Sequence, residues 1–87
     1  MKLYRICTEN VNRDKVEAIV SSYVEGFTIL DAIGYWNGNR EASLIVEIAG
    51  EEKYLHYLIQ TIALHIKQAN KQEAVMVQSF DGESEMI

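Results

Sequence analysis

GFTILDAIGYWNGNREASLIVEI, residues 26–48, contains two extended segments that meet at Asn37-Gly38-Asn39. An Asn-Gly pair tolerates the positive φ angles that a tight hairpin turn requires. On both sides of the turn, apolar and polar residues alternate with the period of half-buried strands. The segment therefore predicts a β-hairpin.

An amphipathic helix is predicted before the hairpin. Asn10 or Asn12 is placed to cap its start, because an asparagine side chain can accept a free backbone N–H, and Gly26 is placed to end it. Its apolar residues recur at helical spacing: Val11, Val16, Ile19, Val20 and Tyr23.

A second, longer helix is predicted after the hairpin. Glu51-Glu52 places acid at its start, and Lys67 and Lys71 place basic residues near its end, as the helix dipole favours. Its apolar stripe consists of Leu55, Leu58, Ile59, Ile62 and Ile66.

Short segments rich in aliphatic and β-branched residues, 2–8 and 72–80, predict one further strand near each end of the chain. The order of elements is then β-α-β-β-α-β. With right-handed crossovers, this order gives a ferredoxin-like sandwich, an α+β fold in which two helices cover one face of a four-stranded antiparallel sheet. We therefore expect a single ferredoxin-like domain over residues 1–80 and an acidic C-terminal tail over residues 81–87.

The sequence also bears on where the protein works. No apolar run reaches the roughly 20 residues that span a bilayer, and Met1-Lys2 followed by a strand pattern is not a signal peptide. Cys7 is the only cysteine, which suits a reducing compartment. We expect a soluble, cytoplasmic protein with no membrane partner.

The charge pattern argues against nucleic-acid binding. Clustered Lys and Arg bind phosphate backbones, whereas this chain has a net charge of −5 and spreads its 8 basic residues along its length. The RNA-recognition module shares the predicted strand order, but it stacks bases on aromatic residues of its central strands. The predicted third strand, EASLIVEI, has no aromatic residue, so we expect no nucleic-acid partner.

One edge of the predicted sandwich collects polar side chains, because several strand and helix ends meet there in this topology. The candidate ligand-binding residues at this edge are Trp36, Arg40, Glu41, Asn70, Gln72 and Glu73, with Thr8, Glu9, Asn10 and Asn37 beside them. Arg40 can hold a carboxylate or phosphate by a planar two-point contact, and Trp36 can offer a stacking surface. Glu41 or Glu73 can accept hydrogen bonds from ligand N–H or hydroxyl groups.

The same edge has a purely structural interpretation. Arg40 can pair with Glu73 across neighbouring strands, and Trp36 can cover the core. Asn70 and Gln72 can cap the end of the second helix. Under this interpretation the edge stabilises the fold and binds no ligand.

Alternation along the strands predicts an apolar patch on the open face of the sheet. In the third strand Ala42, Leu44, Val46 and Ile48 form the expected core face, and the second strand carries large apolar residues beside Asp31. A large exposed patch is unusual on a monomer, so we expect a homodimer or higher homo-oligomer. The alternative is isolated apolar residues on a solvated face, which are common. The candidate association face is Ile29, Asp31, Ile33, Tyr35 and Ile45.

Neither the histidines nor the cysteine predicts a metal or catalytic site. His56 and His65 are nine residues apart on one predicted helix, which turns them to opposite sides. Cys7 has no evident base near it and is predicted to be a buried structural thiol. We therefore expect solvated histidines, no metal, no cofactor and no catalytic residue.

Three motifs follow one another between Gly26 and Val77: G-x-T-x-x-D-x-x-G-x-W, R-E-x-S and Q-E-x-V. The matching residues are Gly26, Thr28, Asp31, Gly34, Trp36, Arg40, Glu41, Ser43, Gln72, Glu73 and Val75. In these motifs the chain resembles an uncharacterised family of small bacterial proteins, a domain of unknown function, although the family's longer insertion at the hairpin is missing here. The resemblance implies a ferredoxin-like fold and no established activity.

Three classes of function fit these observations. The first is a non-enzymatic, oligomeric binding or regulatory module for a small polar or anionic ligand. The second is an acidic interaction protein, such as one encoded by a mobile element that blocks a host factor. The third is a cofactor-free enzyme of the dimeric α+β-barrel type, for which the sequence offers no evident acid–base pair.

Overall fold

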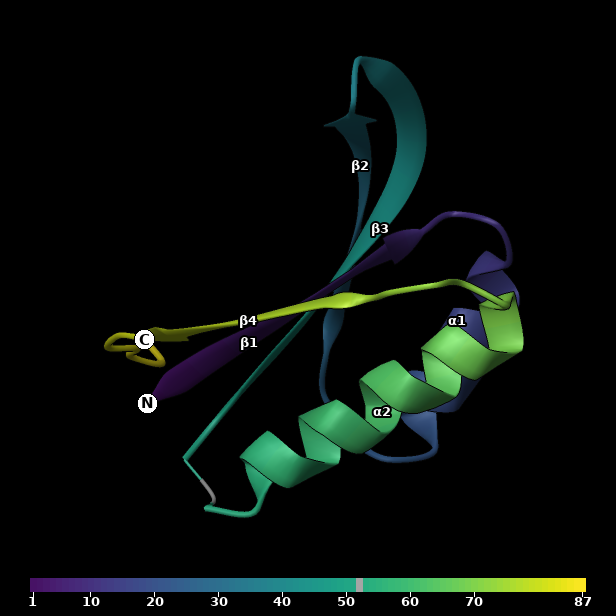
Figure 1. Cartoon of the computed structure of the whole chain (residues 1–87). Coiled ribbons are helices and arrows are strands. Elements are labelled where there is room, and N and C mark those ends of the chain that lie inside the picture. The colour runs from purple at the N-terminus through teal and green to yellow at the C-terminus, as the bar shows by residue number, and fades with distance from the viewer. Residues whose placement is uncertain (52) are drawn as a thin grey trace.

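The computed structural model describes residues 1–51 and 53–87. Within them, six elements follow one another: β1 (Lys2–Glu9), α1 (Arg13–Ser21), β2 (Thr28–Trp36), β3 (Asn39–Gly50), α2 (Leu55–Asn70) and β4 (Met76–Asp81). The strands form one antiparallel sheet in the order β2-β3-β1-β4, and both helices lie against one face of it (Figure 1). This arrangement confirms the predicted ferredoxin-like sandwich.

A two-residue turn joins β2 to β3. Asn37 and Gly38 have φ angles of 51° and 80°, the positive values that a tight hairpin turn requires, and Trp36 pairs directly with Asn39. Residues 33–42, which we call the hairpin arm, extend beyond the pairing of β3 with β1. Figure 1 shows the turn end of the hairpin projecting past the helices.

The start of α1 follows its predicted local signal, but its end does not. Asn12 caps the helix, because its side-chain Oδ1 accepts a hydrogen bond from the Lys15 backbone N–H at 3.4 Å. The helix ends at Ser21, and the backbone N–H and hydroxyl of Ser22 bond to carbonyl groups of its last turn. Gly26 lies beyond this cap, so the prediction that Gly26 ends the helix is wrong.

The predicted charges flank α2 only at its C-terminal end. Lys67 lies in the last turn, and Lys71 then adopts a left-handed conformation with a φ of 55°, which stops the helix. At the other end Tyr54 precedes the helix, and the first turn carries no acidic residue. Glu51 lies upstream of this turn, and Glu52 lies outside the described residues.

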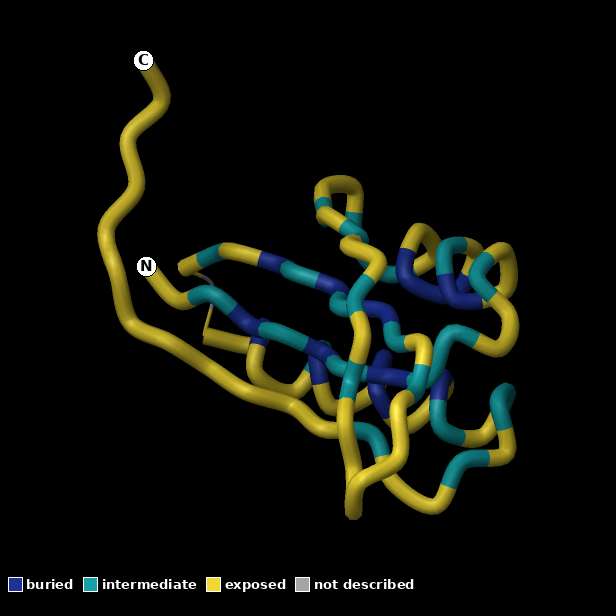
Figure 2. The backbone as a smooth tube through the Cα atoms, turned by 90° about the horizontal axis from the view of Figure 1, so that it is seen from above, coloured by how far each residue is buried: buried dark blue, intermediate teal, exposed yellow. Residues whose placement is uncertain are grey.

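The core lies between the helices and the sheet. Its buried members are Tyr4, Ile6, Leu44, Val46 and Ile48 from the strands and Val16, Ile19, Val20, Leu55, Ile59, Ile62, Ala63 and Ile66 from the helices. The predicted core face of β3 is thus confirmed except for Ala42, which is exposed because it lies in the hairpin arm. Figure 2 shows these buried runs and shows β4 exposed along its whole length. Neither described helix is long and apolar enough to cross a bilayer.

The five residues predicted to form one association face do not share a face. Residues that pair directly across an antiparallel ladder point to the same side of the sheet. Four of the five lie opposite the core-facing series of β3, and therefore on the helix side: Ile29, Asp31, Ile33 and Tyr35. Ile45 lies on the opposite, open face beside Leu30. The two-residue turn sets this register, so the predicted face is corrected.

Candidate functional site

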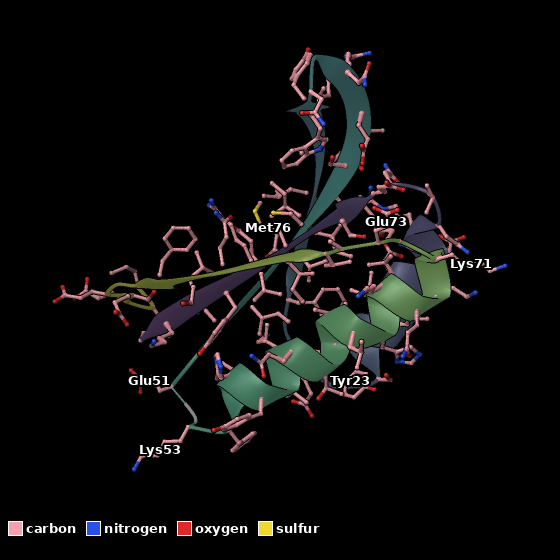
Figure 3. All side chains as sticks on the ribbon, in the orientation of Figure 1. Tyr23, Glu51, Lys53, Lys71, Glu73 and Met76 are labelled. Atoms are coloured by element: carbon pink, nitrogen blue, oxygen red, sulfur yellow. The ribbon has the colours of Figure 1, made fainter. Side chains whose placement is uncertain are left out.

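A cleft of about 750 Å³ lies at the C-terminal end of β1. The hairpin arm forms one wall of the cleft, and the segment that leads from α2 into β4 forms the other. Figure 3 labels Lys71, Glu73 and Met76 along this second wall. The end of β1 supplies the floor with Cys7, Thr8 and Glu9.

Four of the six predicted ligand-binding residues line this cleft. Trp36 and Glu41 come from the arm, and Gln72 and Glu73 come from the segment after α2. Sequence separation between these pairs exceeds thirty residues, and the topology brings them together as predicted. Six further residues that were not predicted from the sequence also line the cleft: Cys7, Ser43, Lys71, Ala74, Val75 and Met76.

Arg40 does not line the cleft. It follows Asn39 in β3 and pairs with Tyr35, so its side chain lies on the helix side of the arm, whereas Glu41 lies on the open side. Among the described residues Arg40 forms no ion pair, and the predicted pairing with Glu73 is not present. An anion held by Arg40 would therefore lie outside the cleft.

Asn70 lies behind the cleft in a partly buried polar network rather than in its lining. Thr8 is 4% exposed, and its hydroxyl donates to Gln72 Oε1. The Asn70 Nδ2 amide donates to Gln72 Oε1 at 3.1 Å and lies 3.5 Å from Thr8 Oγ1. Gln72 Nε2 in turn donates to the Ala74 carbonyl at 3.3 Å. The network ties the end of β1 to the cleft wall that follows α2.

This network replaces the predicted side-chain cap of α2. The helix end is capped by backbone groups, because the Lys71 and Gln72 N–H groups bond to carbonyls of the last turn. The Asn70 and Gln72 side chains are then left to bond with Thr8. Asn70 Oδ1 is buried without a partner among the described residues.

Trp36 gives the cleft a flat aromatic surface. Its indole lies over Gly34, because a Cβ atom at Gly34 would come within 2.8 Å of Trp36 Nε1 and 3.0 Å of Ser43 Oγ. Any side chain at Gly34 would therefore displace the indole. Trp36 remains 50% exposed, so its ring is accessible to a ligand.

The charges that line the cleft are mostly negative. Glu9, Glu41 and Glu73 contribute carboxylates, and Lys71 contributes the single basic side chain of the lining. The whole chain is also acidic, with a net charge of −5. A cleft lined by one sign of charge attracts ligands of the opposite sign, so the field in this cleft favours cations.

Cys7 lies half-buried in the lining of the cleft, whereas the sequence predicted a buried thiol. Burial raises the pKa of the Cys7 thiol, with a smaller opposing effect from Arg5. At neutral pH we expect native protein to react with a thiol reagent much more slowly than protein in urea, since the thiolate is the reactive form. Because the folded-state pKa is raised, the stability that the thiol contributes is present below its unfolded pKa and is lost as pH rises through the folded pKa. Native labelling as fast as that of the unfolded chain would contradict this prediction.

Both histidines are exposed on α2 and contact aromatic residues. His65 Nδ1 lies 3.3 Å from the Tyr23 hydroxyl. The ring centroid of His56 lies 6.3 Å from that of Tyr4 and 5.4 Å from that of Tyr57. The two histidines therefore belong to separate aromatic contacts.

The fold and cleft define a small ferredoxin-like α+β domain, and solved structures share this fold. A DUF3240 family protein from Shewanella baltica has a TM-score of 0.75 at 14% identity, covering 99% of this chain and 93% of that chain. A phage SAM lyase in complex with S-methyl-5′-thioadenosine has a TM-score of 0.72 at 18% identity, covering 92% and 80%. The apo state of a phage SAM lyase has a TM-score of 0.72 at 19% identity, covering 91% and 78%.

These likenesses establish the fold and not the activity. The Shewanella protein belongs to a family of unknown function, and at 14% identity it shows a shared fold, so the resemblance in the three sequence motifs stays a prediction. No family model matches the chain, and no curated protein matches it.

Proposed function

We propose that the chain is a binding module, acting as a homo-oligomer, for a small polar ligand that occupies the cleft at the end of β1. The observation that most supports this proposal is the cleft lining, in which the Trp36 ring and Glu41 share one wall and Glu73 lies on the other. An aromatic face beside carboxylates suits a ligand that carries both a flat ring and a positive charge. The ligand class is therefore cationic or neutral rather than anionic.

Glu41 is the residue best placed to choose between such ligands. It lies on β3 directly opposite Gly34, the residue over which the Trp36 indole lies. A carboxylate held on a strand is positioned more firmly than one on a loop, such as Glu73. A ligand whose ring stacks on Trp36 thus brings its charged group within reach of Glu41.

The single tryptophan of the chain provides the test, because Trp36 lies in the cleft itself. We expect S-adenosylmethionine, a sulfonium nucleoside, to change Trp36 emission with saturation, and ATP, an anionic nucleotide, to leave it unchanged. Glu41→Gln should weaken the binding of the sulfonium nucleoside by about 10- to 100-fold, since charge-assisted contacts contribute about 1.5–3 kcal/mol.

Arg40→Gln is the matched control. It changes a neighbouring charged residue of the same strand whose side chain lies on the other face. We expect this variant to bind as the unchanged protein does. Binding that is lost in Arg40→Gln and retained in Glu41→Gln would overturn the proposal and restore an anionic ligand.

A second candidate is an enzyme that acts on a sulfonium nucleoside. It is favoured by the fold likeness to phage SAM lyases, one of them bound to S-methyl-5′-thioadenosine, together with the carboxylates that line the cleft of this chain. Incubation with S-adenosylmethionine followed by chromatography separates the two candidates. Protein-dependent release of S-methyl-5′-thioadenosine that Glu41→Gln abolishes would favour the enzyme, and recovery of intact ligand would favour the binding module.

A further inference from the structure

Within residues 1–51 and 53–87, nothing pairs with the outer edges of the two outer strands, and these edges lack the usual protection. β2 and β4 carry no proline, lysine or arginine, the residues with which native sheets block the addition of another strand. Each strand has one charged residue, and each of these is paired, Asp31 with Arg13 and Asp81 with Lys2. We propose that the β2 edge of one copy of the chain pairs with the β4 edge of a second copy.

In β4, the backbone N–H and C=O groups of every second residue point toward the free edge of the sheet. The Gly82 N–H donates to the Met1 carbonyl at 3.0 Å. Because hydrogen-bonded pairs alternate along an antiparallel ladder, the even-numbered β4 residues bond inward to β1. The outward-facing backbone groups therefore belong to Val77, Ser79 and Asp81.

On the free edge of β2, as on that of β4, the odd-numbered residues have outward-facing backbone groups. Trp36 and Asn39 close a two-residue turn, so the even-numbered residues of β2 bond inward to β3. The outward-facing backbone groups of β2 then belong to Ile29, Asp31, Ile33 and Tyr35. The side chains of both outward series lie on the helix side of the sheet. If the outward-facing residues of β2 pair with those of β4 in a second copy, the two sheets join into one continuous sheet. The helices of both copies then lie on the same side of it.

The side chains on these two edges also complement each other. In the hairpin arm Ile33 is 53% exposed and Tyr35 is 67% exposed, because no helix covers them. A groove of about 440 Å³ runs between α2 and β4, and its apolar lining consists of Tyr4, Ala63, Leu64, Ala74, Val75 and Val77. A β2 strand added beside β4 would place its helix-side residues over this groove. Backbone pairing and apolar burial would thus occur together.

The same contact would border the cleft at the end of β1. Ala74 and Val75 line both the groove and the cleft. The hairpin arm of the neighbouring copy would therefore contact one wall of the cleft. Any effect of this contact on ligand binding rests on the proposed function. Since β2 and β4 are different surfaces, the contact is head-to-tail, and two or more copies can close into a ring through it.

Light scattering and native mass spectrometry at micromolar concentration test the contact with two variants. Ser79→Pro removes an outward N–H from the β4 edge and spares the bonds to β1, where an edge strand tolerates proline. Ile33→Lys places a charge on the arm. We expect the unchanged protein to have at least twice the 9.9 kDa chain mass. Each variant should be a folded monomer by circular dichroism, and Ser79→Ala, which keeps its N–H, should remain assembled.

Mixing the two variants gives the sharper result. Ser79→Pro keeps an intact β2 edge and Ile33→Lys keeps an intact β4 edge, so a head-to-tail contact predicts a one-to-one complex of the two monomers. A monomeric unchanged protein would overturn the proposal, as would variants that both stay assembled or a mixture that does not associate. Ligand binding does not enter this test, so its outcome is independent of the cleft.

Discussion

Replacing Ile6 with alanine is expected to lower the free energy of unfolding by about 3–4 kcal/mol. Ile6 is fully buried at the middle of β1, a central strand of the sheet, and it lies on the face that the helices cover. Truncation removes its transfer free energy and leaves a cavity that neighbouring side chains fill only in part. For a domain of this size the melting temperature should fall by about 12–30 °C.

Urea unfolding followed by circular dichroism measures this loss, and Ile45→Ala is the matched control. Ile45 is also an isoleucine of a central strand, but it lies on the open face and is only partly buried. We expect the control to lose about 1 kcal/mol, because its side chain is already in contact with water. Equal losses at the two positions would contradict the assignment of a single core between helices and sheet.

The elements of the fold could be predicted because their signals are local. Asn37-Gly38 specifies the hairpin turn, and the predicted apolar positions of α2 are all buried or partly buried against the core. The end of α1 was less predictable. Ser22 stops that helix with hydrogen bonds that any serine can form, and Gly26 lies in the loop that follows.

The prediction of the association face was wrong because the hairpin turn has two residues rather than three. Treating Asn37-Gly38-Asn39 as a three-residue turn leaves open which face of β2 joins which face of β3. The two-residue turn pairs Trp36 with Asn39 and so places Ile33 on the helix side. A one-residue change of register moves every side chain of a strand to the other face, so turn length alone separates Ile45 from the four β2 residues.

The candidate site was predictable in position but not in charge. Topology alone brings Trp36, Glu41 and Glu73 to one edge of the sandwich. Arg40 and Glu41 are consecutive residues of one strand, and consecutive strand residues point to opposite faces. The prediction put both residues in one site. It therefore placed the positive charge of Arg40 in the cleft, whereas the structure places Arg40 on the other face of the strand. The polar network of Asn70 depends on contacts between distant segments, which no local pattern encodes.

The second large effect is expected at the network behind the cleft, where Thr8→Val should cost about 1–3 kcal/mol of stability. Valine preserves the shape of the buried side chain but removes the hydroxyl that donates to Gln72 Oε1. Gln72 and Asn70, which are half-buried, then keep fewer partners, and polar groups shielded from water are costly to leave unpaired. Thr28→Val, at an exposed position of β2, is the control and should unfold as the unchanged protein does.

Thr8→Val should also loosen the cleft itself. Gln72 holds the wall after α2 through Thr8 on one side and the Ala74 carbonyl on the other, so loss of the Thr8 contact frees the segment that carries Glu73. We expect weaker binding of S-adenosylmethionine in the Trp36 fluorescence titration, at temperatures where the variant is still fully folded. Reduced stability with unchanged binding would restrict the network to a structural role. Unchanged stability would show that the Thr8 hydroxyl finds no partner in Gln72 in solution.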